Sequence, residues 1–95
     1  MRLTKKEIEA IISSFDEVFG GGQIYLFGSR VDDTKKGGDI DLYIITEQKE
    51  NLTRKKIDFL VNLKQKIGEQ KIDVVISRDK DRPIEQEALS KGIAL

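Results

Sequence analysis

The sequence contains no cysteine and no histidine among its 95 residues. Without cysteine there are no disulfide bonds and no thiolate nucleophiles, and without histidine there is no imidazole base. Together the two absences exclude nearly every zinc or copper site, because those metals depend on sulfur and imidazole ligands. Any metal site must therefore be built from oxygen atoms, which suit magnesium or manganese.

An excess of charge of one sign and long apolar runs are missing as well. Lysine and arginine together number 17, and so do aspartate and glutamate, so the formal net charge is zero. General DNA and RNA binders carry surplus positive charge, and we therefore expect no direct nucleic-acid partner. No apolar stretch approaches the length of a membrane span, and residues 1–7 carry charges where a signal peptide would be apolar. These features predict a cytoplasmic protein without a membrane partner.

Helical and extended patterns alternate along the chain, and its length predicts a single domain over residues 1–95. Thr4 and Glu7 form a capping-box pair at the start of the first helix, and the glycines at 20–22 end it. A second long helix is predicted from residues 51–53 to Gly68. The residues that mark this helix are Ile57, Leu60, Val61, Lys64 and Ile67.

A closing helix begins at Pro83 and ends before Gly92. Its inward positions are predicted to be Ile84, Ala88 and Leu89. Three short apolar runs predict strands over residues 24–27, 39–45 and 72–76, and the polar stretch 30–38 has room for a short helix. Helices that alternate with strands are typical of an α/β or α+β fold. We predict a small mixed sheet of three or more strands with the helices packed mainly on one face.

Two aspartates stand two positions apart in the second predicted strand. Asp39 and Asp41 would share one face with Tyr43, because side chains alternate along a strand. Aspartate is uncommon in strands, and two like charges about 7 Å apart repel by roughly 2.4 kcal/mol at an effective dielectric constant of 20. A bound divalent cation would reverse that sign. Two solvated acids on an exposed sheet face are the alternative.

Asp73 interrupts the third apolar run. If its strand lies beside the strand of Asp39, a third carboxylate joins the first two, and oxygen donors on adjacent strands can hold two magnesium ions. Such an ion pair stabilises both the entering and the leaving oxygen of an in-line phosphoryl displacement. A solvated position on an edge strand is the other interpretation of Asp73.

Gly28 and Ser29 follow the first predicted strand. A tight turn there, at a helix N-terminus, can present N–H groups and a hydroxyl to phosphate oxygens. Arg30 can add positive charge for the terminal phosphates. An ordinary serine N-cap and a solvated arginine are the alternatives. The acids downstream favour nucleotide binding, and we therefore predict Gly28, Ser29 and Arg30 as nucleotide-binding residues.

These segments in combination resemble the nucleotidyltransferase superfamily related to DNA polymerase beta. The resemblance is carried by Gly28-Ser29-Arg30, Asp39-Ile40-Asp41-Leu42 and Asp73. It is closest to the minimal members of the superfamily, the MNT or MntA-like proteins, and it covers nearly the whole chain. The closing segment, residues 87–95, is similar to the usual C-terminal helix of that family.

The resemblance implies a nucleotidyltransferase fold in which Gly28 and Ser29 bind the triphosphate, while Asp39 and Asp41 ligate magnesium. Asp73 would be the third carboxylate ligand and would assist deprotonation of the acceptor hydroxyl, which then attacks the α-phosphate and expels pyrophosphate. Arg30 matches the arginine that commonly follows Gly-Ser in this family. Residues 31–33 depart from the small residues often found next.

Minimal members of this family commonly occur as antitoxins paired with a HEPN-domain ribonuclease toxin, and some transfer AMP from ATP to a tyrosine of that partner. The resemblance therefore implies ATP as substrate, two Mg²⁺ ions, with Mn²⁺ as a substitute, and a HEPN-domain toxin as partner. Two alternatives stay open: an antitoxin that acts by binding alone, and a transferase for a small-molecule hydroxyl such as that of an antibiotic. The base of the nucleotide and self-association into a homo-oligomer stay open as well.

Overall fold

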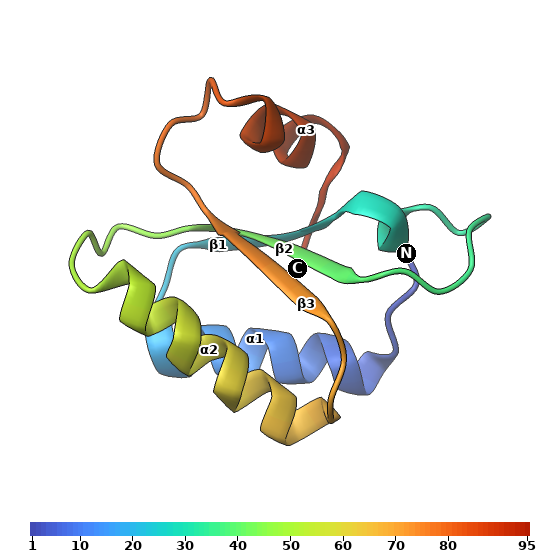
Figure 1. Cartoon of the computed structure of the whole chain (residues 1–95), viewed down its shortest axis with the longest axis horizontal. Helices are drawn as coiled ribbons and strands as arrows, with labels where there is room; N and C mark the ends of the chain where they lie inside the picture. Colours follow the sequence, from blue (N-terminus) through green and yellow to red (C-terminus); the bar gives the residue numbers. More distant parts are fainter.

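The computed structural model describes all 95 residues and contains a four-stranded mixed sheet with helices on both faces (Figure 1). The elements in chain order are α1 (Lys5–Phe19), β1 (Gln23–Phe27), the short 3-10 helix η1 (Gly28–Val31), β2 (Ile40–Ile45), α2 (Leu52–Ile67), β3 (Ile72–Ile76), α3 (Pro83–Lys91) and β4 (Ile93–Ala94). The strand order is β3-β2-β1-β4. Only the β2–β3 pair is parallel.

The first helix forms as its sequence predicts. The Glu7 backbone N–H donates to the Thr4 hydroxyl at 3.1 Å, and the Thr4 N–H donates to the Glu7 carboxylate at 2.9 Å, which completes the capping box. Gly20 ends the helix in the left-handed conformation with φ 75°. The apolar stripe of α1 faces the sheet and contributes Ile11, Phe15 and Phe19 to the core.

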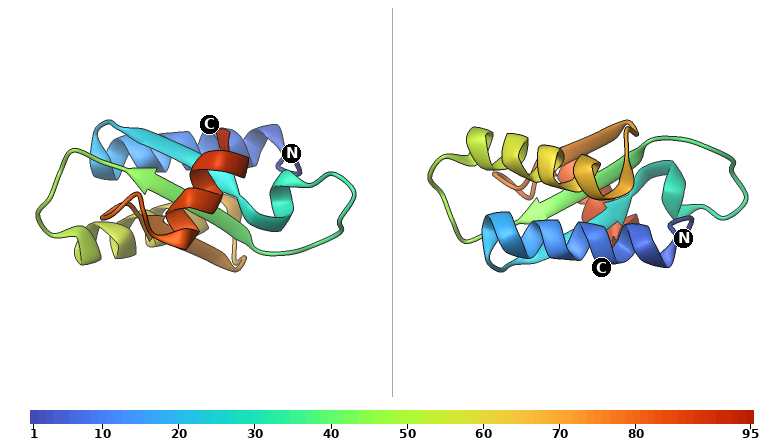
Figure 2. Two further views of the ribbon diagram at one scale, coloured as in Figure 1. Left: turned by 90° about the horizontal axis from the view of Figure 1, so that it is seen from above. Right: turned by 90° about the horizontal axis from the view of Figure 1, so that it is seen from below.

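The predicted alternation of β2 is confirmed. Its residues Ile40, Leu42 and Ile44 are completely buried between the sheet and the two long helices. Asp41 and Tyr43 point to the opposite face, where Tyr43 packs with Phe27 and Ala88 of α3. α1 and α2 therefore cover one face, as predicted for the helices, and α3 alone covers part of the other (Figure 2).

The inward side of α3 differs from its prediction. Ile84 and Leu89 were expected to face the sheet, but they are 41% and 37% exposed. The completely buried residues of this helix are Ala88 and Glu85. The prediction was wrong because a short helix has too few apolar residues to show which of its sides faces the sheet. The buried position is occupied by an acid, Glu85, which an apolar pattern does not reveal.

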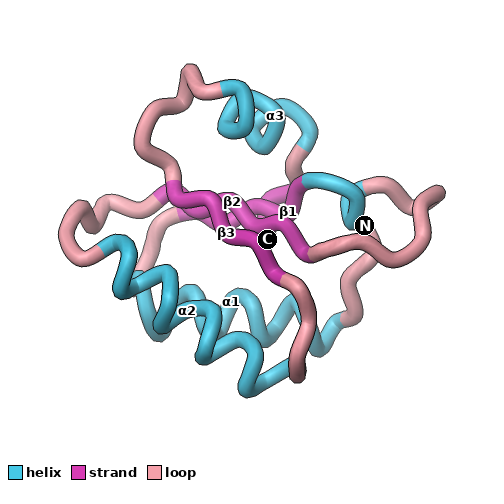
Figure 3. The backbone as a smooth tube through the Cα atoms, in the orientation of Figure 1, coloured by secondary structure: helices cyan, strands magenta, loops and turns pink.

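Other differences lie between the regular elements. The short helix begins at Gly28, ahead of the predicted stretch 30–38, and a long loop then leads to β2 (Figure 3). The closing segment is helical only to Lys91, and β4 follows, with Ile93 paired to Leu26 of β1. A two-residue strand is too short to show periodicity in a sequence. None of the helices has the length and apolar character needed to cross a membrane.

Candidate active site

Asp41 and Asp73 lie side by side on two strands. They are register partners in the parallel pair β2–β3, so both side chains point to the face that α3 covers. Asp41 is half-buried, whereas Asp73 is exposed. The structure thus brings together two aspartates that are 32 positions apart in the sequence, from Asp41 to Asp73.

Asp39 takes a different position from the one its spacing predicts. β2 begins at Ile40, so Asp39 is the last residue of the preceding loop. Its Oδ2 is 3.4 Å from Nζ of Lys71, with which it forms an ion pair. No group of three acidic side chains is gathered closely enough in the structure to hold a metal ion. The structure therefore pairs Asp41 with Asp73 and leaves Asp39 beside them, neutralised by Lys71.

The electrostatics of Asp41 show an excess of negative charge. Burial raises the pKa of its carboxyl group, and the charges of Asp73, Asp39 and Glu87 raise this pKa further. Lys71 acts in the opposite direction but does not outweigh these effects. Neither Asp41 nor Asp73 takes part in a salt bridge. The two carboxylates therefore have no cation in salt-bridge contact, and the negative charges around Asp41 outweigh the charge of Lys71.

The residues present fit a divalent cation in their chemistry. Carboxylate oxygens are the ligands that Mg²⁺ and Mn²⁺ prefer, and a cation between Asp41 and Asp73 would replace their repulsion by attraction. Asp39 would join them by exchanging its contact with Lys71 for the ion. Bound there, such an ion would polarise a phosphoryl oxygen and neutralise charge that develops on it.

The turn at the end of β1 touches the Asp41 carboxylate. Phe27, the last residue of β1, is the register partner of Asp41, and Gly28 follows with φ 75°. A Cβ atom at Gly28 would collide with the Asp41 carboxylate oxygen. Glycine is therefore required here for both its backbone conformation and its lack of a side chain. The turn predicted to bind phosphate and a predicted metal ligand are direct neighbours.

Ser29 is held by a second close approach. Gly38 has φ 89°, and a Cβ atom at this position would collide with Oγ of Ser29. The loop over residues 28–38 therefore closes on itself so that the Ser29 hydroxyl lies against the backbone of Gly38. The role predicted for Ser29 in binding phosphate stays a prediction.

Arg30 contacts the loop itself. Its Nε donates to the Gly38 carbonyl oxygen at 3.1 Å, and its Nη1 donates to the Arg2 carbonyl oxygen at 2.9 Å. These bonds commit much of the guanidinium group to the backbone. The role predicted for Arg30 in binding terminal phosphates stays a prediction, and the observed role is to hold the two ends of the loop together.

Arg2 is a residue of this region that the sequence did not reveal. Its guanidinium group donates to three backbone carbonyls of the loop, those of Ser29 at 2.8 Å, Asp32 at 2.9 Å and Gly37 at 2.6 Å. The Arg2 backbone N–H also donates to the Arg30 carbonyl at 2.7 Å. No spacing or motif marks Arg2, because its partners are backbone atoms far along the chain.

A buried carboxylate fixes the segment that leads into α3. Glu85 Oε1 accepts hydrogen bonds from the hydroxyls of Tyr43 at 2.7 Å and Ser77 at 2.5 Å. Oε2 accepts from Nε of Arg82 at 2.8 Å and from the backbone N–H of Asp79 at 2.9 Å. Burial acts to raise the pKa of Glu85, but these donors together outweigh it and hold the pKa far below its ordinary value.

This cluster matters for the site because α3 also carries Glu87, whose charge reaches Asp41. No sequence pattern marks this cluster, because an acid in an amphipathic helix is usually solvated. Tyr43, on the same face of β2 as Asp41, is completely buried. Its hydroxyl bond to Glu85 adds an anchor between β2 and α3.

Comparison with known proteins agrees with this geometry. The family model described as polymerase beta, nucleotidyltransferase matches residues 6–95. Among curated proteins, none matches the chain significantly. The match covers both strands of the aspartate pair, the turn at Gly28 and α3. The chain belongs to the polymerase beta nucleotidyltransferase family.

Proposed function

We propose that this nucleotidyltransferase is magnesium-dependent and transfers AMP from ATP to a tyrosine hydroxyl of a partner protein, a HEPN-domain toxin for which it acts as the antitoxin. One observation carries the proposal: Asp41 and Asp73 share one sheet face beside the Gly28 turn, and neither forms a salt bridge. A cation-bound triphosphate is the ligand whose charges complement that arrangement. The family resemblance supplies the partner and the acceptor.

Each residue has a role that follows from its place. Gly28 and Ser29 receive the triphosphate, and Asp41, Asp73 and Asp39 hold the magnesium ions. Asp73, the most exposed of the aspartates on this face, accepts the proton of the acceptor hydroxyl. The hydroxyl oxygen forms a bond to the α-phosphorus while the bond to pyrophosphate breaks. Pyrophosphate leaves, and AMP remains as a phosphodiester on the acceptor.

A protein acceptor is favoured over a small molecule by the shape of the site. None of the cavities in the structure is lined by Asp39, Asp41 or Asp73. Small substrates bind in concave pockets that bury most of their surface. A tyrosine presented by a second protein needs no such pocket in this chain, because the partner itself positions the hydroxyl.

The test is mass spectrometry of a co-purified HEPN-domain partner after incubation of the pair with each nucleoside triphosphate and magnesium. We expect AMP on a partner tyrosine with ATP, and none when Asp39→Asn and Asp41→Asn are combined. Asp16→Asn with Asp58→Asn is the matched control, because both aspartates are exposed and lie on the helices of the other face. The control should transfer AMP as the wild type does.

Two outcomes would contradict the proposal. Undiminished transfer by the Asp39→Asn, Asp41→Asn variant would show that the aspartates do not carry the chemistry. An unmodified partner, still neutralised in cells by both the wild type and this variant, would favour an antitoxin that acts by binding alone. Transfer of AMP to a small-molecule hydroxyl without any partner protein would favour a small-molecule nucleotidyltransferase.

A further inference from the structure

The outer edge of β3 is an unpaired strand edge. β3 stands at the end of the sheet order, and its pairing with β2 is parallel. The bonds Ile40 N–H to Lys71 carbonyl and Ser77 N–H to Ile44 carbonyl fix which residues face β2. The backbone groups of Ile72, Val74 and Ile76 must then point outward, because neighbouring residues alternate in direction. No proline or bulge interrupts this edge.

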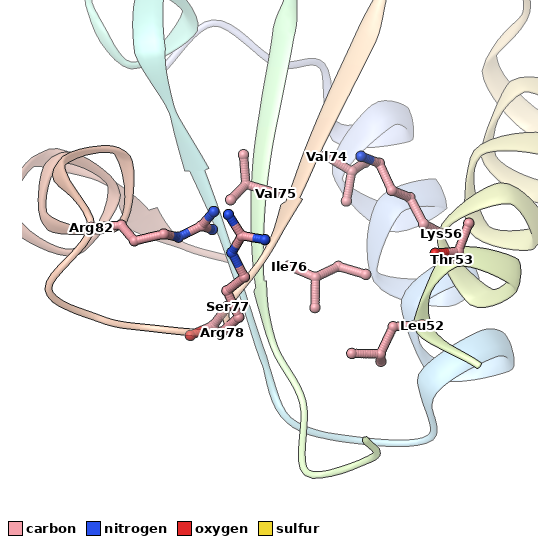
Figure 4. A pocket seen from close by; sticks show the side chains of 9 residues that line it. All are labelled: Leu52, Thr53, Lys56, Val74, Val75, Ile76, Ser77, Arg78 and Arg82. Atoms are coloured by element: carbon pink, nitrogen blue, oxygen red, sulfur yellow. The ribbon is translucent and has the colours of Figure 1, made fainter. Parts of the chain in front are cut away.

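A groove of about 400 Å³ runs along the second half of this edge, between β3 and the first turns of α2. Its walls contain three cationic side chains and no acidic one: Lys56, Arg78 and Arg82. Figure 4 shows Arg78 and Arg82 on the side of β3 that faces α3, and Lys56 reaching from α2 toward β3 on the other side. Lys56 and Arg78 form no salt bridge, whereas Arg82 forms one with Glu85.

The α2 side of the groove combines apolar side chains with Thr53 and Lys56. Val74, Ile76 and Leu52 line it on that side in Figure 4. Ile57 follows Lys56 on the helix, and Val61 lies one turn further along; both are 52% exposed. A strand placed here would therefore meet apolar side chains on one face and two guanidinium groups on the other.

We propose that the outer edge of β3 docks an extended segment of a partner protein in which acidic and apolar residues alternate. The segment adds a strand to the sheet, with its backbone bonded to Val74 and Ile76. Its acidic side chains face Arg78 and Arg82, and its apolar ones face Leu52 and Ile76. Val74 is only 4% exposed, so the side chain of Lys56 moves aside as the strand enters.

A second copy of this chain fits the edge less well. Antiparallel pairing of two β3 edges centred on Val74 would place Lys71 opposite Ser77 of the other copy and next to Arg78 of that copy. Such a contact adds like charges at both ends of the interface. The acidic segment instead complements the three cations. The lining of the groove begins at Val74 and does not include Asp39, Asp41 or Asp73. The proposal does not depend on nucleotidyl transfer.

The test is an NMR titration of the whole chain with a blocked heptapeptide in which glutamate and valine alternate. A matched peptide with lysine in place of glutamate is the probe for charge. We expect the acidic peptide to shift the Val74 and Ile76 amides and to protect them from hydrogen exchange, with no such effect from the lysine peptide. Arg78→Glu should weaken binding at least tenfold, and Val74→Pro, which removes one outward N–H, should weaken it as well.

The control for charge reversal is Lys6→Glu on α1, which should bind the acidic peptide as the wild type does. The proposal is overturned by an acidic peptide that leaves the β3 amides unchanged at millimolar concentration, or by equal binding to the wild type and to folded Arg78→Glu. It is also overturned, in favour of a second copy, if the peptide-free chain dimerises and protects the Val74 and Ile76 amides as its concentration rises.

Discussion

Asp41 combines the features expected of a metal ligand in the absence of its metal. It is half-buried, it touches the turn at Gly28, and its register partner on β3 is another aspartate, Asp73. Stability alone would favour a neutral residue at this position, because like charges that share a sheet face repel. The proposed cation would give this carboxylate a role that the fold alone does not supply.

Replacement of Asp41 by asparagine should stabilise the metal-free protein at neutral pH. The folded state raises the pKa of Asp41, so the ionised form costs free energy above the ordinary value of 3.8. We expect Asp41→Asn to raise the free energy of unfolding by about 0.5–1 kcal/mol at pH 7, after allowance for solvent screening. The gain should shrink as the pH falls toward 4. Urea unfolding with a chelator present measures both effects.

Asp16→Asn, at an exposed site on α1 where the side chain forms no salt bridge, serves as the control and should leave stability nearly unchanged. A loss of stability in Asp41→Asn at pH 7 would contradict the electrostatic account of the pair. In the wild type, magnesium with a non-hydrolysable ATP analogue should raise the unfolding temperature, and the same addition should have little effect on Asp41→Asn.

Glu85 is the opposite case, an acid whose charge the fold stabilises. Glu85→Ala should lower the free energy of unfolding by about 3–5 kcal/mol, because it leaves buried donors without an acceptor. Glu85→Gln should lower the free energy of unfolding by a smaller amount. The pKa of Glu85 is lowered from 4.5, so its contribution is present above that pH and is lost as the pH falls below it.

The difference between wild type and Glu85→Gln should therefore be largest near neutral pH and should narrow below about pH 4.5. Glu9→Gln, an exposed glutamate on α1, is the control. A difference that stays constant with pH would show that the charge of Glu85 is unimportant and that only its shape matters.

At the scale of elements, the segment over residues 28–38 is organised by two arginines, Arg2 ahead of α1 and Arg30 in η1. Arg2 binds three of its carbonyls, and Arg30 closes it onto Gly38. Hydrogen bonds from charged donors are worth more than neutral ones, and here they hold the irregular residues that follow η1. The loop is thereby ordered before a nucleotide arrives.

Arg2→Ala should weaken ATP binding about tenfold, or about 1.4 kcal/mol, because part of the binding free energy is then spent on ordering the loop. Calorimetric titration of the nucleotide measures this effect, and faster hydrogen exchange at Ser29 should accompany it. Lys5→Ala, an exposed neighbour with no hydrogen bond from its side chain, is the control. Unchanged ATP affinity in Arg2→Ala would show that the order of this loop does not contribute to ATP binding.

The sequence was sufficient for the elements that bury a periodic apolar face. α1 is defined by its capping box and glycine stop, and β2 by the alternation of Ile40, Leu42 and Ile44. It was insufficient where a contact depends on distant partners. The inward position of Glu85, the pairing of β4 and the contact of Asp39 with Lys71 are set by tertiary packing, which no local pattern encodes.

At the scale of the whole molecule, the strand order makes β2 the meeting point of the three motif segments. β1 brings Gly28 to one side of Asp41, and β3 brings Asp73 to the other. The two long helices pack beneath this layout, and α3 lies on the site face with Glu87 (Figure 1). The residue types of the site were predictable from the sequence, whereas the side of Asp41 on which each would lie required the topology.

The central claim is that Asp41 and Asp73 hold a divalent cation beside the Gly28 turn, and paramagnetic broadening by manganese measures it most directly. Mn²⁺ titrated with a non-hydrolysable ATP analogue into the whole chain should broaden the amide signals of Gly28, Ser29, Asp41 and Asp73 first. The Asp39→Asn, Asp41→Asn variant should lose this selectivity. Broadening that begins at other acidic positions, such as Asp79 and Asp81, and spares Asp41 and Asp73 would contradict the account.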